Sequence, residues 1–335
     1  MKRNYRSIIL VAEDRGGYDA LLPVAEKIRK LKDFSVELVL AGRASEFAKC
    51  KKIKHLKGIN PKGKPDIILL GTSGSNTSID KKIIQSAKVS NIPTISFVDF
   101  WSNYNLRFGE SGEFLPNYIL AIDQRMKREL NMYLDKVKKR AEIVVTGSPR
   151  FDRINYSSSG SHVIFYSQPL KGYEVKIFKD IVGGLEKFYP FEKVLLKLHP
   201  SEKNEEKFLR IIKRSKLQIK IEIKQSVEQL NKKANLVIGA DSMALFISCL
   251  MGKKTISYQP GKSEQNDFLA SNEYGWSVPA YTKGELFSAL LAARKKKSRK
   301  RESFEQYTRN DSAQKVVDFI KKLLININQT CKYGS

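Results

Sequence analysis

The chain has 335 residues, of which 41% are hydrophobic, and a formal net charge of +26. This length and composition exclude a disordered chain and allow two domains of ordinary size. The three cysteines, Cys50, Cys249 and Cys331, lie far apart, which excludes a disulfide framework and a cysteine metal site and favours a reducing cytoplasm.

The first half of the chain alternates apolar runs with helical periodicity. Strands are predicted at 8–12, 36–40, 66–71, 93–98, 118–122 and 143–147, and helices at about 21–31 and 79–90. This alternation indicates βαβ units and a parallel sheet. The run at 8–12 follows a basic N-terminal segment but is too short for a signal peptide.

The second half repeats the alternation after a break at 148–161 that contains a proline, a glycine and several serines. Strands are predicted at 163–167, 194–198, 219–223, 236–238 and 255–258, and an amphipathic stretch at 313–324. No run approaches the roughly 18–20 apolar residues of a transmembrane helix. We therefore expect two Rossmann-like, doubly wound α/β domains facing a cleft, with boundaries after residues 150 and 305.

Lysine and arginine are spread through most of the chain and peak in the run Arg294–Arg301. Three interpretations fit this run: a solvated helix surface, which is favoured, a surface for anionic lipid, and a nucleic-acid face. Basic residues gain about 1 kcal/mol each near an anionic leaflet, which makes peripheral membrane binding physically reasonable. Nucleic acid is the least favoured partner, because no RNA-binding module or aromatic stacking platform accompanies the charge.

One histidine follows a predicted strand directly and is the first candidate for a ligand contact. His199 comes after the apolar run 194–196, and Pro200 biases it towards extended backbone, so we expect its ring at the strand tip. There it can bind a phosphate or donate a proton to a departing one. The alternative is a structural histidine, which is the role we expect for His55 and His162.

A second candidate follows the predicted strand 236–238, at the start of a helix. Gly239 permits close backbone approach, Asp241 or Ser242 can cap the helix, and its free N–H groups, near Met243, can receive phosphate oxygens. Strand ends of one parallel sheet share the edge where such sheets bind ligands. Together with the histidine, this segment predicts a site for a nucleotide or another phosphorylated ligand. An ordinary capped helix is the alternative.

Two glutamine–proline pairs end other predicted strands of the second half. Gln168 precedes Pro169, and Gln259 precedes Pro260. Each glutamine is a candidate for reading a base or a sugar hydroxyl in the same donor site. Alternatively, each proline simply ends its strand.

Carboxylates follow two predicted strands of the first half. Glu13 and Asp14 lie in the first loop, before Gly16 and Gly17, and a carboxylate there can deprotonate an acceptor hydroxyl. A solvated loop that uses its glycines for turning is the alternative. Asp99 follows a later strand and is the other candidate base.

Polar and aromatic residues near these carboxylates are the candidates for binding an acceptor. Trp101, Tyr104 and Arg107 lie in a segment that mixes aromatic and polar groups, as sugar-stacking surfaces do, although a packed loop has the same composition. Thr72 and Ser73 lie in a small polar loop that can contact an anion or substrate hydroxyls.

Several chemical signatures are absent from the sequence. No Asp-x-Asp pair and no His/Cys cluster occurs, so we expect no metal ion. The polar loop at 72–78 is no P-loop, and no Gly-x-Gly-x-x-Gly follows a strand, which argues against a dinucleotide oxidoreductase. We expect no cofactor apart from a nucleotide-sugar substrate.

The pattern resembles the GT-B glycosyltransferase superfamily and, within it, a bacterial surface-polysaccharide branch. The segment 197–200 is similar to the His-Pro motif of sialyl- and polysialyltransferases, capsular Kdo transferases and CDP-glycerol glycerophosphotransferases. The segment 167–169 is similar to the Gln-Pro motif of the Kdo transferases. Segments 241–245 and 252–257 match the serine-containing turn that follows in these families. The segment 13–16 is similar to a paired-acid motif of polysialyltransferases, with an arginine inserted.

This resemblance implies that the second domain binds the nucleotide, that the first binds the acceptor, and that a C-terminal helix within 306–335 crosses back to the first domain. Segment 147–152 also resembles the non-hydrolysing UDP-N-acetylglucosamine 2-epimerases. We therefore expect a metal-independent glycosyltransferase of capsule or lipopolysaccharide synthesis, using a CMP- or CDP-activated donor first and a UDP-sugar second. The alternatives are an epimerase-like enzyme, an inactive domain, or a basic protein that binds membranes or nucleic acid.

Overall fold

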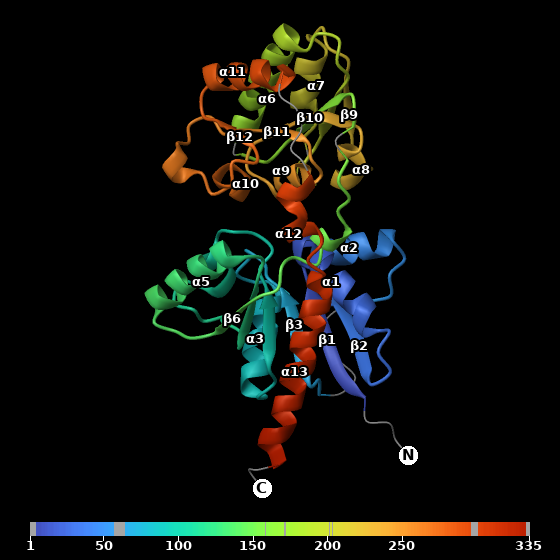
Figure 1. Ribbon diagram of the computed structural model, residues 1–335, viewed down its shortest axis with the longest axis vertical. Coiled ribbons are helices and arrows are strands. Elements are labelled where there is room, and N and C mark those ends of the chain that lie inside the picture. Colours follow the sequence, from blue (N-terminus) through green and yellow to red (C-terminus); the bar gives the residue numbers. More distant parts are fainter. Residues whose placement is uncertain are drawn as a thin grey trace. The chain divides into compact units, whose positions relative to one another are not determined.

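The computed structural model describes residues 5–56, 64–157, 159–170, 172–200, 202, 204–295 and 301–332. The chain divides into two compact units (Figure 1). Unit 1 contains residues 1–153 and 309–335, and unit 2 contains residues 154–308. The boundaries therefore fall after residues 153 and 308, close to those expected at 150 and 305. In the part of the chain that is described, no helix is long and apolar enough to cross a membrane.

Unit 1 is a six-stranded, fully parallel sheet with helices on both faces. Its strands, in the spatial order β2-β1-β3-β4-β5-β6, are β1 (Arg6–Ala12), β2 (Phe34–Leu40), β3 (Ile67–Gly71), β4 (Thr94–Phe97), β5 (Tyr118–Ala121) and β6 (Glu142–Val145). Its helices are α1 (Arg15–Ile28), α2 (Gly42–Cys50), α3 (Ile79–Val89), α4 (Tyr104–Phe108), α5 (Gln124–Val137), a 3-10 turn (Phe151–Arg153) and α13 (Ser312–Lys332).

The central strands of unit 1 are buried on both faces, which is why they read as continuous apolar runs. All five residues of β3 are buried. On one face, α3 packs Ile79, Ile83 and Ile84, at helical spacing, against alternate residues of the strands such as Ile9 and Val11.

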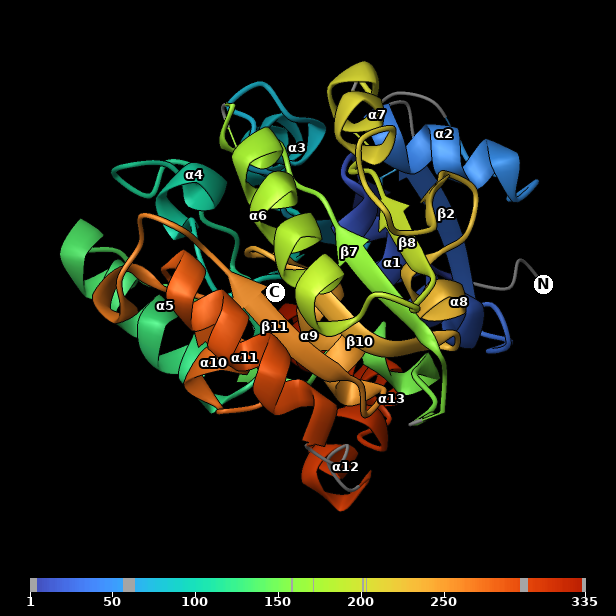
Figure 2. The same ribbon diagram turned by 90° about the horizontal axis from the view of Figure 1, so that it is seen from above.

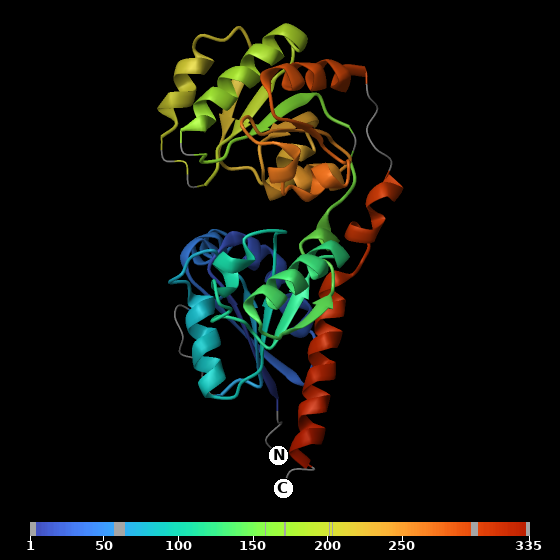
Figure 3. The same ribbon diagram turned by 90° about the vertical axis from the view of Figure 1, so that its left-hand side faces the viewer.

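The last helix, α13, belongs to unit 1 although the whole of unit 2 precedes it in the chain. It lies along unit 1 (Figure 3), contacts α1, and buries the apolar residues Ala313, Val316, Val317, Ile320, Leu323 and Leu324. Its first turn is held by Asp152, whose carboxylate accepts hydrogen bonds from the backbone N–H groups of Ser312 (2.9 Å) and Ala313 (2.8 Å).

Replacing Asp152 by alanine should therefore loosen the start of α13. Both N–H groups lose their acceptor, so we expect unfolding in urea to become easier by about 1 kcal/mol. As a control, Asp318→Ala removes only an exposed bond from Gln314 Nε2 within the same helix, and should change stability by about 0.5 kcal/mol at most. Equal destabilisation by the two variants would contradict the capping role.

Unit 2 is also a six-stranded parallel sheet. Its strands, in the order β12-β11-β10-β7-β8-β9, are β7 (His162–Tyr166), β8 (Val194–Lys197), β9 (Ile219–Glu222), β10 (Ala234–Gly239), β11 (Lys254–Tyr258) and β12 (Val278–Ala280). Its helices are α6 (Tyr173–Phe188), α7 (Glu206–Ile212), α8 (Val227–Asn231), α9 (Met243–Leu250), α10 (Ala270–Glu273), α11 (Lys283–Lys295) and α12 (Glu305–Thr308), with 3-10 turns at Glu264–Asn266 and Arg301–Phe304.

Figure 2 shows β11, β10, β7 and β8 side by side, with α6 crossing over them. On this face, Phe178 of α6, Phe208 of α7 and Leu290 of α11 form one core with the strands. The expectation of two Rossmann-like, doubly wound α/β domains is confirmed.

In both units the first strand lies inside the sheet. The strands that follow it are added on one side, and the strand order then reverses, so that the remaining strands are added on its other side. In unit 1 the reversal lies between β1 and β3, and in unit 2 it lies between β7 and β10. In such sheets, ligands bind beyond the carboxyl ends of the strands at this point. The topology therefore singles out one edge of each sheet before any side chain is considered.

Candidate functional site

In unit 2, Gln168 bridges the two strands between which the sheet reverses. It follows β7, and its Oε1 accepts a hydrogen bond from the backbone N–H of Asp241 (2.6 Å), while its Nε2 donates to the Asp241 carbonyl. Both ends of the amide are thus used to hold the turn between β10 and α9. We had expected Gln168 to read a base or a sugar; its hydrogen bonds make it a support for the turn.

The turn itself presents polar atoms that have no partner in the described part of the chain. These are the buried Ser242 Oγ and Asp241 Oδ1. Ser242 occupies the N-cap position of α9 but its hydroxyl caps no backbone N–H. A buried polar atom without a partner costs about 1–3 kcal/mol, so such atoms call for an explanation, and a bound ligand supplies one.

Other features of this segment agree with an ordinary packed helix. α9 buries Leu245, Phe246 and Ile247, while Met243 in its first turn is only half-buried. A Cβ on Gly239 would lie 3.3 Å from the Tyr166 carbonyl oxygen, which shows how closely β10 approaches β7 here. The helix is therefore packed in the core from Leu245 onwards, and the buried polar atoms without a partner among the described residues lie at its start.

Lys262 adds a positive charge beside this turn. Its Nζ lies 3.0 Å from Asp241 Oδ2, and the side chain is about one-third exposed. Nothing in the sequence around Lys262 distinguishes it from the many other lysines, so it was missed. Near a helix start, a lysine adds to the attraction for a phosphate.

Gln259 follows β11 but is only 3% exposed. Its Nε2 donates to Ser257 Oγ and to Asp267 Oδ1, each at 2.9 Å, while its Oε1 has no partner among the described residues. Asp267 also accepts from Asn272 and Tyr281. Gln259 therefore lies inside a polar network behind the strand end, which favours a supporting role over direct recognition.

His199 lies at the end of β8, the strand next to β7. Its backbone N–H donates to Ser167 Oγ (3.1 Å), and its carbonyl accepts from the N–H of Glu202 (2.8 Å). The ring is half-buried and Pro200 is exposed. The structure thus brings His199, Gln168 and the Ser242 turn to the ends of three neighbouring strands, β8, β7 and β10.

Lys207 of α7, which the sequence analysis did not single out, joins the start of α6 to the loop after β8 that contains His199. Its Nζ lies 2.7 Å from both Glu174 Oε1 and Glu202 Oε2. Burial opposes the lysine's charge, but its hydrogen bonds to the two carboxylates outweigh this and raise the pKa of Lys207. Glu174 Oε2 in turn accepts from the backbone N–H groups of Leu170 and Gly172.

The variant Lys207→Met should release these two loops while preserving the aliphatic stem of the side chain. We expect faster amide hydrogen exchange at Leu170 and Gly172, because Glu174 loses its counter-charge, with unchanged far-UV circular dichroism. Lys213→Met, at an exposed position just after α7, is the matched control. Unchanged exchange in Lys207→Met would show that the loops hold their shape without it.

The other two histidines have structural contacts. His55 Nε2 lies 3.0 Å from Ser45 Oγ, and its Nδ1 lies 2.8 Å from the carbonyl of Ile53. His162 begins β7, at the opposite edge of the sheet from His199. The contacts of His55 agree with the structural role expected for it, and the role of His162 stays a prediction.

In unit 1, the expected acceptor-side residues form one cluster beyond β1, β3 and β4. Arg107 Nη1 lies 2.8 Å from Asp99 Oδ1 and donates to Thr72 Oγ1 at 2.6 Å. A Cβ on Gly16 would fall 1.7 Å from Asp99 Oδ2, so only glycine leaves room for this carboxylate. Gly17 has a different role, because its Cβ would lie 2.9 Å from the backbone of Gly71 and push α1 off β3.

The three candidate bases differ in what holds them. Glu13 Oε2 accepts from the backbone N–H of Ile79 (2.7 Å) at the start of α3, and Asp99 is paired with Arg107. Asp14 occupies the N-cap position of α1 but makes no capping hydrogen bond. Within the described ranges no other group holds its half-buried carboxylate. Asp14 is therefore the candidate whose oxygens are available to a substrate.

The expectation that Trp101 stacks on a sugar is wrong. Its ring is 2% exposed, and its Nε1 donates to both oxygens of Asp123, at 3.0 Å each, so it is part of the core. Tyr104 is half-buried and donates from its hydroxyl to Glu129 Oε2 (2.6 Å). Burial, followed by this hydrogen bond, raises the pKa of Tyr104.

Two buried residues of α3, Asp80 and Lys81, hold Ser73 and its loop in place. The backbone N–H of Ser73 donates to Asp80 Oδ2 (3.2 Å). Lys81 Nζ donates to the carbonyls of Ser75 (2.8 Å) and Leu106 (2.6 Å), which connects this loop to α4. Ser73 is therefore fixed in place, and its 3% exposure leaves little of it for a ligand.

Among the described residues, no group of three or more His, Cys, Asp or Glu side chains could hold a metal ion.

Solved structures with a similar fold include UDP-GlcNAc 2-epimerases and glycosyltransferases. The UDP-GlcNAc 2-epimerase of Neisseria meningitidis, solved with UDP-GlcNAc, shares 13% identity and a TM-score of 0.69, over 94% of this chain and 100% of its own. The S. aureus protein MnaA, solved with UDP, shares 14% identity and a TM-score of 0.70, over 95% and 97%. A glycosyltransferase of Rickettsia africae shares 13% identity and a TM-score of 0.60, over 96% and 99%.

No protein-family model matches the chain, and no curated protein matches it significantly in sequence. At 13–14% identity, the structural matches show a shared fold, which consists of two Rossmann-like α/β domains. The expected fold class is confirmed, while membership of the superfamily and of its surface-polysaccharide branch stays a prediction.

Proposed function

We propose that this protein is an enzyme that acts on a nucleotide-activated sugar and binds it through unit 2. The observation that carries the proposal is the meeting of His199, the Gln168-supported turn and the start of α9 at neighbouring strand ends. The N–H groups at the start of α9 and the charge of Lys262 suit a phosphate.

For the reaction, we propose metal-independent glycosyl transfer with Asp14 as the base. Asp14 Oδ would take the proton of an acceptor hydroxyl as the new glycosidic bond forms, and the nucleotide would leave with its phosphate bound by unit 2. The free carboxylate of Asp14 supports this assignment over the hydrogen-bonded Glu13 and the ion-paired Asp99.

A ligand-dependent thermal shift with CMP, CDP, UDP and GDP tests the nucleotide site. We expect stabilisation by at least one of the four, with CMP or CDP favoured by the sequence motifs and UDP by the ligands of the structural neighbours. His199→Ala should weaken that stabilisation. His55→Ala, which removes a histidine of unit 1, should keep it. Indifference to all four nucleotides would overturn the proposal.

A second candidate reaction is epimerisation at C2 of UDP-N-acetylglucosamine. It is favoured by the higher TM-scores of the structures named as epimerases, 0.67–0.69 against 0.60–0.61 for two glycosyltransferases. An epimerase needs no acceptor, so NMR of UDP-N-acetylglucosamine incubated with the protein alone separates the two reactions. Appearance of the C2 epimer would establish this second candidate, and its absence would favour transfer.

The acceptor is proposed on the resemblance to surface-polysaccharide enzymes alone: a glycan or lipid-linked acceptor of capsule or lipopolysaccharide synthesis. A peripheral position on the inner face of an anionic membrane, reached through the basic run Arg294–Arg301, belongs to the same proposal. Within that run, residues 296–300 lie outside the described part of the chain.

A further inference from the structure

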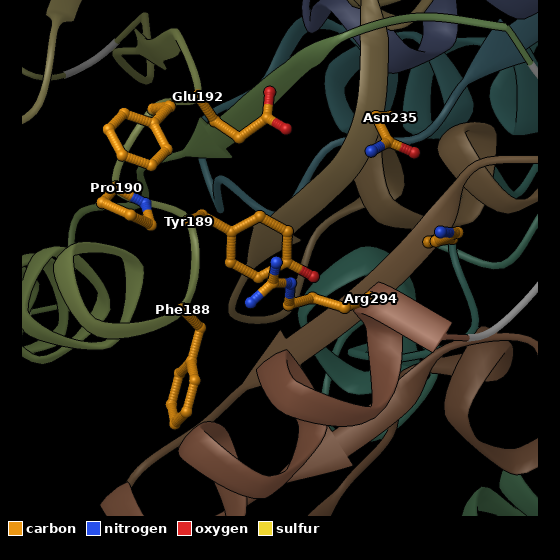
Figure 4. A pocket seen from close by; sticks show the side chains of 8 residues that line it. Phe188, Tyr189, Pro190, Glu192, Asn235 and Arg294 are labelled. Atoms are coloured by element: carbon orange, nitrogen blue, oxygen red, sulfur yellow. The ribbon is translucent and has the colours of Figure 1, made fainter.

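Unit 2 carries a polar hollow at the opposite edge of its sheet from His199. It has a volume of about 170 Å³ and lies where β8, β10 and β11 begin. Its lining includes Phe188, Tyr189, Phe191, Asn235, Lys254 and Arg294. Figure 4 shows Arg294 extending from the end of α11 towards the ring of Tyr189. Strands of about five residues separate this hollow by about 17 Å from the carboxyl ends of the strands, where His199 and the Ser242 turn lie.

The rim of this hollow exposes apolar groups to solvent. Phe191, in the loop between α6 and β8, is 97% exposed, the highest value among the large hydrophobic side chains described. Leu291 is 48% exposed and lies three residues before Arg294 on α11, so the two share a side of the helix. Phe191 and Leu291 thus place apolar side chains in solvent beside the hollow.

The same surface is positively charged. Arg294, Lys295 and Lys193 are exposed. Lys254 Nζ donates to the Ala293 carbonyl (2.9 Å), which leaves its other N–H donors for an anion. Glu192 is the single acidic side chain of the lining. The surface therefore combines one protruding aromatic ring with a surplus of cations.

We propose that this edge of unit 2 docks on an anionic phospholipid bilayer. The ring of Phe191 enters the interface between headgroups and acyl chains, and Arg294 and Lys254 bind a lipid phosphate in the hollow. This proposal does not depend on the nucleotide site. It gives the expected membrane association a definite surface, and it leaves the carboxyl edge of the same sheet, with His199 and Ser242, away from the lipid.

A bilayer fits these residues better than a single-stranded nucleic acid. Nucleic-acid channels stack successive bases on several exposed rings. Here Tyr189 is 6% exposed and its hydroxyl is bonded to the Leu290 carbonyl, while Phe188 is half-buried with its ring against Phe287. Phe191 is therefore the one exposed aromatic ring in the lining of the hollow. Interfacial binding needs only an apolar insertion and surrounding cations.

Sedimentation with vesicles tests the proposal on the full chain. We expect binding to phosphatidylcholine vesicles that contain phosphatidylglycerol, and little binding to phosphatidylcholine alone. Phe191→Ser and Arg294→Glu should each lower the partition coefficient about tenfold. The matched controls are Ile223→Ser, at an apolar residue 67% exposed, and Lys224→Glu, both just beyond the other end of the sheet. They should bind as the wild type does.

Three results would overturn the proposal. The first is failure of the wild type to sediment with the anionic vesicles. The second is equal loss of binding in the controls, which would indicate only a general effect of charge. The third is tighter binding to a single-stranded oligonucleotide that is unchanged in Phe191→Ser. The nucleotide thermal shift of the Phe191 and Arg294 variants should match the wild type, so a failed nucleotide site and a failed membrane surface give different results.

Discussion

Ser242→Asp should weaken nucleotide binding by ten- to a hundredfold while leaving the protein folded. Aspartate is an accepted N-cap residue, and far-UV circular dichroism checks that α9 stays folded in the variant. The new carboxylate would occupy the position where the start of α9 and Lys262 attract a phosphate, and at about 4 Å two negative charges repel strongly even near a protein surface. Isothermal titration calorimetry with the nucleotide found by thermal shift measures the change.

Ser226→Asp provides a control with the same change of charge at the same helix position. Ser226 is the N-cap of α8, where its hydroxyl accepts from the N–H of Gln229, and it follows β9 at the far side of the sheet. Its substitution should leave affinity within about twofold, because exposed charges further apart than about 10 Å are largely screened by salt. Equal losses in both variants would mean that the phosphate is not held at the Ser242 turn.

Asp14→Asn should abolish most of the proposed transfer and leave donor binding unchanged. An amide cannot accept the proton of the acceptor, and loss of a general base costs about 10²–10⁴ in rate. The side chains otherwise have the same shape, and asparagine remains a good residue for the start of α1. Release of nucleotide from the donor, in the presence of a panel of glycan acceptors, measures the rate.

Glu13→Gln serves as the comparison, because Glu13 already accepts the Ile79 N–H and a glutamine oxygen can do the same. We expect it to keep most of the rate. A full rate in Asp14→Asn, or an equal loss in Glu13→Gln, would remove Asp14 from the role of base. Neither outcome would affect the nucleotide site in unit 2, which calorimetry measures separately.

The sequence predicted the fold well because buried parallel strands leave a clear signal. Runs such as 67–71 are apolar throughout, since helices cover both faces of the sheet. The same reasoning placed His199 and Ser242 at strand ends, where the chain leaves the core. The spatial order of the strands was not predictable in this way, because pairing between distant segments leaves no local pattern.

Side-chain partners were the part that the sequence could not supply. Gln168 and Trp101 follow strands, as binding residues do, yet one supports a backbone turn and the other is in the core. Lys207 and Lys262 form ion pairs near the carboxyl ends of the unit 2 strands, but they are two among 61 lysines and arginines. Which charges pair depends on distances between loops, and the sequence records only the presence of the charges.

The placement of α13 has a consequence for how the protein folds during synthesis. Unit 1 needs Val316, Val317 and Ile320 to complete its core, but these residues leave the ribosome only after all of unit 2. Unit 2 is continuous in the chain and can therefore finish folding first, which reverses the usual order from the N-terminus. Until α13 arrives, nascent unit 1 presents an uncovered apolar face to chaperones and to other chains.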